Sequence, residues 1–215
     1  PAGVTAADAG TSRAQAAHAA IHRVSESTRT SQLGAAQRHD LVVLAPPGAS
    51  DPNSAQALVR AGIPHITATV REATAVVGPL VVPGETACLR CLDLHRTDRD
   101  PGWPVIAAQL ATDGRRSGVE ACDVALATLA ASTCALQVLS FIDGARPATC
   151  NGTLELALPD WRIRRRTWLP HPACGCDWGP EPTAPRHLAA EAAEAAQAAE
   201  HAQDARTMQV HGPER

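Results

Sequence analysis

The first part of the chain alternates polar stretches with short apolar runs, in an order that predicts helix, strand and helix. Residues 11–24 are alanine-rich behind a capping hydroxyl and favour a surface helix. Residues 41–45 are wholly apolar with branched side chains, as in a strand buried on both faces of a parallel sheet. Asp51 or Asn53 can cap a second helix, which Gly62 would end. This order is half of a βαβ unit.

The middle of the chain changes to a pattern typical of strands. Residues 66–70 and 75–82 are rich in valine, threonine and isoleucine, and only a short polar segment separates them. They predict a strand and its hairpin partner. Residues 97–118 are polar and contain proline, glycine and aspartate, so we expect a loop or a crossing segment there.

The later part contains a long uncharged stretch followed by a basic hairpin. Residues 124–142 carry no charge over a length that could span a membrane. Alanine, serine, threonine and glutamine dilute this stretch, so a buried, close-packing helix is the better interpretation. Residues 153–158 alternate polar and apolar side chains, and residues 162–168 add a strand rich in arginine. Those arginines favour a solvated edge protected against aggregation over a phosphate site.

The composition divides the chain into a body and a tail. Residues 1–178 form the predicted domain, whereas residues 179–215 begin with a proline-rich linker and continue as an alanine- and glutamate-rich helix outside the core. The chain begins at Pro1 and its single methionine is Met208. We therefore expect the sequence to be a piece of a longer protein.

Charge and composition exclude several partners. The net charge is −3, 45% of the residues are hydrophobic, and all 19 basic residues are arginine. This balance indicates a soluble globular protein with no attraction for nucleic acid or membrane. Tyrosine is absent and phenylalanine occurs once, which argues against base stacking on aromatic side chains. Seven cysteines in a chain of this length do not require disulfides, and we predict a cytoplasmic protein with reduced thiols.

Two short cysteine pairs form the strongest chemical motif. Cys88 and Cys91 make a CxxC, and Cys174 and Cys176 make a CxC far along the chain. Zinc takes four soft ligands in a tetrahedron, and two close pairs supply them with one loop closure. Because CxC is tighter than the usual spacing, His171 stands as a possible substitute ligand.

Alternative roles for these cysteines fit the pattern less well. A thioredoxin-like CxxC opens a helix near a βαβ pattern, whereas this one follows a predicted hairpin. A catalytic zinc keeps three protein ligands and an open position, so four thiolates favour a structural zinc and disfavour zinc-dependent hydrolysis. The remaining cysteines, Cys122, Cys134 and Cys150, are most simply small buried residues.

Taken in order, these motifs resemble the ThiF/MoeB/HesA family, the bacterial relatives of ubiquitin-activating enzymes. The likeness covers about residues 3–178 and rests on the strand at 40–44, the segment 77–91, the helix start at 119–121 and the closing CxC at 174–176. The actinobacterial branch associated with cyclodehydratases of azole-containing peptides is the most similar. The cysteine frame is the specific part of this resemblance.

The resemblance implies a fold and an activity. The fold would be α/β: a Rossmann-like, mostly parallel sheet flanked by helices, with a structural zinc clamp and a C-terminal hairpin. The activity would be an ATP- and Mg²⁺-dependent adenylation of the C-terminal carboxylate of a small ubiquitin-like protein or peptide. The family commonly forms homodimers, and a peptide-modifying enzyme would be a further partner.

The sequence departs from the family at its nucleotide site. The glycine-rich GxGxxG loop is missing from this chain and should precede Pro1. Arg13 stands where the family has a nucleotide-contacting lysine. Pro47 stands at the position of a metal-binding aspartate, and the nearest acid is Asp51. Arg13 and Asp51 are thus the nucleotide-binding candidates, and no catalytic residue is assigned. An adenylyltransferase and a catalytically degenerate peptide- or leader-binding scaffold both remain open.

Overall fold

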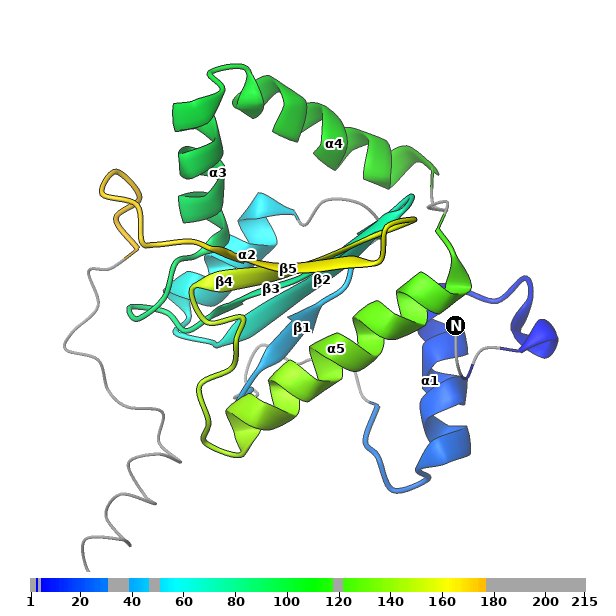
Figure 1. Cartoon of the computed structure of the whole chain (residues 1–215). Coiled ribbons are helices and arrows are strands. Elements are labelled where there is room, and N and C mark those ends of the chain that lie inside the picture. Colours follow the sequence, from blue (N-terminus) through cyan, green and yellow to red (C-terminus); the bar gives the residue numbers. More distant parts are fainter. Residues whose placement is uncertain (1–2, 4, 31–38, 47–50, 118–121, 177–215) are drawn as a thin grey trace, which may run out of the picture.

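The computed structural model is a mixed α/β domain in which helices flank one five-stranded sheet (Figure 1). It describes residues 3, 5–30, 39–46, 51–117 and 122–176 of the 215-residue chain. The strands lie in chain order: β1 (Val42–Leu44), β2 (His65–Arg71), β3 (Thr74–Val81), β4 (Gly152–Ala157) and β5 (Arg162–Thr167). The helices are η1 (Ala6–Asp8), α1 (Arg13–Val24), α2 (Pro52–Arg60), α3 (Leu89–Arg99), α4 (Trp103–Ser117) and α5 (Val124–Ile142). Figure 1 shows α3 and α4 on one side of the sheet and α1 and α5 on the other.

The direction of the strands corrects one prediction. Only β1 and β2 pair in parallel, and β2–β3, β3–β4 and β4–β5 are all antiparallel. The expectation of a mostly parallel sheet is therefore wrong for the described strands. Glu72 and Ala73 alone join β2 to β3, and so short a connection permits only an antiparallel pair. The parallel pair is the one with a helix, α2, in its crossover.

The two N-terminal helices are confirmed, and their caps explain where they begin. Ser12 accepts a hydrogen bond from the Gln15 amide, and the Gln15 side chain returns one to the Ser12 amide, which completes a capping box. Asp51 caps α2 by accepting from the amides of Asn53 and Ser54. Side chains that satisfy the first free amides of a helix fix its start from local sequence alone.

A second correction concerns residues 97–118, which we expected to form a loop. They hold the end of α3 and all of α4. Asp100, Pro101 and Gly102 form the junction between the helices, where the Asp100 carboxylate accepts from the Gly102 amide, whereas Gly114 lies within α4. Pro104 lies in the first turn of α4, where its missing amide proton leaves no hydrogen bond unmade.

Helix α5 is confirmed in position but differs in burial. Leu126, Ala130 and Phe141 face the sheet and pack in a core formed with β2, β3 and β4. The opposite side is exposed, and Leu136 retains 65% of its accessible surface. α5 is long and apolar enough to cross a membrane by length and composition, and one of its faces packs on the sheet. The prediction of a buried helix holds for the face on the sheet and is wrong for the opposite face.

One glycine holds the sheet close to the loop that precedes β4. Gly78 in β3 has a φ of +94°, and a Cβ placed there would lie 2.8 Å from the Gly152 carbonyl oxygen and 2.9 Å from the Thr149 side chain. Glycine is therefore required both by the backbone conformation and by the close approach of backbone atoms. The Gly78 carbonyl also accepts from the buried Thr67 hydroxyl at 2.7 Å.

We expect Gly78→Ala to lower the free energy of unfolding by about 3 kcal/mol, through combined conformational strain and overpacking. The matched control is Gly62→Ala: Gly62 has a φ of +66° but open space around its Cβ position. This control should cost only about 1 kcal/mol, the price of the left-handed conformation. Urea unfolding of both variants measures the difference. Equal losses of unfolding free energy in the two variants would show that the close approach of Gly152 to Gly78 adds no cost to a side chain at position 78.

Candidate metal centre

The four cysteines of the two predicted pairs meet at one point. The Sγ atoms of Cys88 and Cys91 are 3.8 Å apart, those of Cys88 and Cys174 3.5 Å, and those of Cys91 and Cys176 3.3 Å. A tetrahedron with zinc–sulfur distances of about 2.3 Å has edges of about 3.8 Å. A disulfide would require about 2.05 Å, and all four are free thiols. The cluster therefore has the size and the donor set of a four-thiolate metal site.

The first pair is positioned by the start of α3. Cys88 is the N-cap residue and Cys91 lies within the first turn, so both side chains face the same direction. The preceding loop is held by Thr86, whose hydroxyl accepts from the Val82 amide at 2.8 Å. Asn151 fixes the next residue by accepting from the Ala87 amide at 2.7 Å. The CxxC follows the β2–β3 hairpin as predicted, but it also opens a helix, as a redox pair does. The convergence of four sulfurs is the stronger evidence for a metal site.

The second pair is positioned by a tight turn after β5. The Cys174 amide donates to the His171 carbonyl at 2.9 Å, which closes the turn. Gly175 has a φ of +68°, a left-handed conformation that glycine adopts without steric cost. This reversal between Cys174 and Cys176 allows a spacing of one residue to present both sulfurs to the same point. A spacing of one residue is therefore sufficient, and the structure brings four candidate cysteine ligands together.

The electrostatics of the cluster favour binding of a cation. Hydrogen bonding from the Cys88 thiol lowers the pKa of Cys91 to about 4. The same hydrogen bond, together with burial, raises the pKa of Cys88, whereas burial raises the pKa of Cys174 to about 12 and also raises that of Cys176. Burial therefore opposes the ionisation of Cys88, Cys174 and Cys176 while no cation is bound. A divalent metal would supply the positive charge that stabilises these groups as thiolates.

His171, considered as a substitute ligand, has a different role. Its backbone amide donates to the Cys91 sulfur at 3.3 Å. Its Nδ1 accepts from the Ala173 amide, so we assign the proton to Nε2, which then donates to the Asp98 carboxylate at 2.9 Å. Both ring nitrogens are therefore engaged, although His95, Asp98 and His171 lie close enough together to suggest a second metal site. The hydrogen bond from His171 to Asp98 instead holds the turn that supplies an N–H···S hydrogen bond to Cys91.

A small apolar core surrounds the cluster and joins it to the sheet. Trp168, which is only 2% exposed, packs with Val81 and Leu92 beside the cysteines. Its Nε1 donates to the Thr153 hydroxyl in β4 at 3.0 Å, and its backbone amide donates to the Asn151 carbonyl at 2.9 Å. The cysteine cluster is therefore packed against the sheet through Trp168 and Val81.

The other candidate residues lie on different elements. Arg13 is the first residue of α1, and Asp51 is the N-cap of α2, where its carboxylate also accepts from the Ser54 hydroxyl at 2.8 Å. Neither element carries a cysteine of the cluster. Among the remaining cysteines, Cys134 and Cys150 are buried as expected, but Cys122 is exposed, so that prediction is wrong. Pro47, residues 119–121 and the tail from 179 to 215 lie outside the described residues.

The fold and the cysteine cluster define an α/β protein with a candidate four-cysteine metal centre. No family model matches the sequence, and no curated protein matches it. Solved structures of MccB from E. coli do share the fold.

With MccA-N7isoASN, MccB has a TM-score of 0.59 and 19% identity over 81% of this chain and 54% of its own. MccB with ATP has a TM-score of 0.57 and 20% sequence identity, and the match covers 80% of this chain and 52% of MccB. The microcin C7 biosynthetic enzyme MccB with N-formylated MccA has a TM-score of 0.58 and 20% sequence identity, and the match covers 80% of this chain and 54% of the enzyme. The chain thus spans little more than half of these structures.

Proposed function

We propose that this chain is the C-terminal portion of a ThiF/MoeB-like adenylyltransferase that uses ATP to activate the C-terminal carboxylate of a peptide or small ubiquitin-like protein. The observation that carries the proposal is the fold shared with MccB, which was solved with ATP and with its MccA peptide. The cysteine frame, on which the family resemblance rests, supports it independently because its four sulfurs converge. The adenylation domain would comprise residues 1–178, with residues 179–215 as a tail.

The proposed reaction joins the substrate to AMP. A carboxylate oxygen attacks the α-phosphorus of ATP, the bond from that phosphorus to the bridging oxygen breaks, and pyrophosphate leaves with the electron pair. The resulting acyl adenylate is a better electrophile than a carboxylate. Mg²⁺ would neutralise charge on the phosphates, and positively charged side chains would assist.

Within this chain, residue roles follow from position and charge. Arg13 would contact phosphate from the start of α1, and Asp51 would approach Mg²⁺ only if its carboxylate left its helix cap. Zinc held by Cys88, Cys91, Cys174 and Cys176 would be structural, because four thiolates leave no open position. The full-length protein would act as a cytoplasmic homodimer.

The test is ATP–pyrophosphate exchange measured on the full-length protein with candidate peptides that end in a free carboxylate. We expect exchange that depends on both ATP and the peptide, and Arg13→Ala should reduce it by about 10²-fold. Arg29→Ala is the matched control, because Arg29 is an exposed arginine beyond the end of α1. A peptide amide in place of the free carboxylate should give no exchange.

The second candidate function is a peptide- or leader-binding scaffold for a modification enzyme. It is favoured by the commitment of the Asp51 carboxylate to the cap of α2, where it meets two backbone amides and a hydroxyl. A full-length protein that binds the peptide but neither binds ATP nor catalyses exchange would establish the scaffold and refute the enzyme.

A further inference from the structure

The arginine-rich strand β5 forms one edge of the described sheet. It pairs with β4 on one side, and the strand order ends with it among the described strands. Five of its six residues are exposed. An edge strand presents unpaired backbone N–H and C=O groups, to which an extended chain can add as a further strand.

The register shows which backbone groups of β5 face outward. The Trp168 amide donates to the Asn151 carbonyl at 2.9 Å, directly after the pair Thr167–Gly152. In an antiparallel ladder, hydrogen-bonded and non-hydrogen-bonded pairs alternate. The amides and carbonyls of Ile163, Arg165 and Thr167 therefore point away from β4. This is a regular row of donors and acceptors, as strand addition requires.

One face of the edge carries an excess of positive charge. Arg164 and Arg166 both pair with Glu155, at 3.0 and 2.9 Å, so one carboxylate serves two guanidinium groups. Arg162 lies on the same face and pairs with no acidic side chain of the described residues. The row keeps a net positive charge along the whole strand, which is complementary to an acidic chain.

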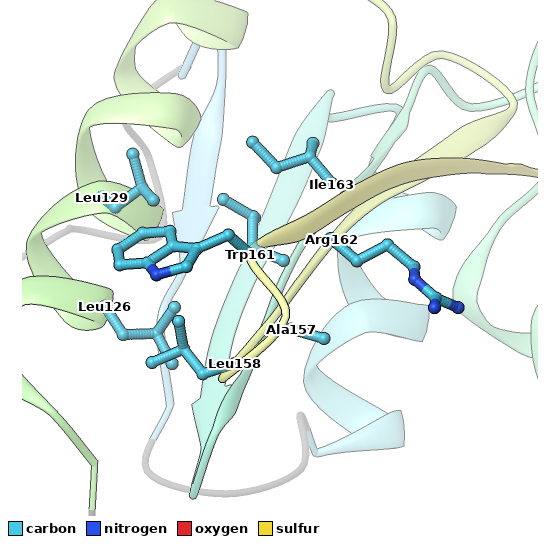
Figure 2. Close-up of a pocket in the computed structure, with 8 residues that line it drawn as sticks. Leu126, Leu129, Ala157, Leu158, Trp161, Arg162 and Ile163 are labelled. Carbon is cyan, nitrogen blue, oxygen red and sulfur yellow. The ribbon is translucent and has the colours of Figure 1, made fainter.

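The other face carries an apolar hollow beside the same strand (Figure 2). Ile163 and Trp161 line it from the hairpin, and Leu126 and Leu129 line it from α5. Trp161 and Ile163 are 66% and 64% exposed. In Figure 2 the Arg162 guanidinium extends away from Trp161 and Leu129, although Arg162 also contributes to the lining. Arg165 shares the face of Ile163, where its guanidinium donates to the carbonyls of Ala148 and Cys150.

We propose that β5 is a docking edge for an extended acidic peptide, which adds to the sheet with acidic side chains over Arg162, Arg164 and Arg166. Its alternate residues are apolar, and one of them covers the hollow beside Trp161. The alternation of side chains along a strand presents both sets at once. This inference goes beyond adenylation and does not depend on it, because the docked segment is separate from the reacting carboxylate.

The observations favour docking over a merely protected edge. Charged side chains alone would discourage edge-to-edge aggregation, as the sequence suggested. A protected edge gains nothing from an exposed tryptophan and isoleucine beside it, since exposed apolar surface promotes association. The combination of an outward-facing hydrogen-bonding row, three arginines on one face and an apolar hollow beside Ile163 on the other is that of a binding edge.

The experiment measures fluorescence anisotropy of labelled, capped peptides with the full chain, in the absence of nucleotide. A peptide in which glutamate alternates with valine should bind, and the same peptide with lysine in place of glutamate should bind at least about tenfold more weakly. A glutamate–valine peptide N-methylated at every residue has no backbone N–H to donate to β5 and should also bind at least about tenfold more weakly. Equal binding of the lysine peptide, or of the methylated peptide, would overturn the proposal.

Variants locate the binding surface. Arg162→Glu and Trp161→Ala each change an exposed side chain, and each should weaken the acidic peptide by about tenfold. Arg29→Glu makes the same charge reversal at an exposed position after the end of α1, outside β5, and should leave the affinity for the acidic peptide unchanged. Equal effects of Arg29→Glu and Arg162→Glu would mean that only net charge matters, which would refute docking on β5. Because ATP is absent, a negative result leaves the adenylation proposal standing.

Discussion

Replacing Cys88 with serine is expected to abolish stable metal binding and to lower the free energy of unfolding by at least about 5 kcal/mol. A structural zinc contributes its binding energy to folding, about 10 kcal/mol or more for small zinc domains. Loss of one thiolate leaves three ligands and the buried Cys91 and Cys174 without their shared cation. The wild-type chain should contain about one zinc ion, and the variant well below that, by elemental analysis.

Cys122→Ser is the control for the metal prediction, because it removes an exposed cysteine outside the cluster. It should leave the metal content and the unfolding temperature unchanged. Chelation should destabilise the wild type strongly but have little further effect on Cys88→Ser. A purified wild-type chain that holds no zinc, or a Cys88→Ser variant that keeps it, would contradict the four-cysteine assignment.

Trp168→Ala should be the second most destabilising change, with a loss of about 3–5 kcal/mol, the usual cost of deleting a large aromatic side chain from a core. Trp168 fills the space between β4 and the cysteine cluster, and its indole also donates to Thr153. Three guanidinium groups also face its ring, with Cζ atoms 5.4, 5.4 and 5.7 Å from the centroid in Arg96, Arg99 and Arg166. The variant therefore loses these cation–π contacts as well.

Two further variants separate the contributions of Trp168. Trp168→Phe keeps most of the apolar volume but leaves the Thr153 hydroxyl without its donor, so it should cost about 1–3 kcal/mol. Trp161→Ala removes a tryptophan that is 66% exposed and should change stability by less than about 1 kcal/mol. Denaturant titration orders the three variants, and a loss at Trp161 as large as at Trp168 would show that burial is not the cause.

Local signals in the sequence predicted most elements. Capping side chains such as Ser12 and Asp51 bind backbone amides within the next three residues. The start of each helix can therefore be predicted from the local sequence. The alternation over residues 153–158 likewise predicted the hairpin of β4 and β5. The convergence of the two cysteine pairs was also predictable, because metal chemistry limits what such pairs can do together.

Features that depend on distant partners were not predictable in the same way. The direction of a strand depends on the path between strands, so the parallel sheet expected from β1 did not extend beyond β2. The hydrogen bond between His171 and Asp98 joins residues 73 positions apart, and nothing local marks Asp98 as a support for the cysteines. The exposed side of α5 carries the same residue types as its buried side, so composition could not reveal it.

The cysteine cluster also determines what would happen to a chain that has been cut. Cys88 and Cys174 are 86 positions apart, so a metal held by both pairs closes α4, α5 and the β4–β5 hairpin into a ring. A protease that cuts once between α4 and α5 would release no fragment, since the two pieces would stay joined through metal–sulfur bonds and the β3–β4 pairing. Removal of the metal would leave that pairing and the surrounding packing as the connection between them.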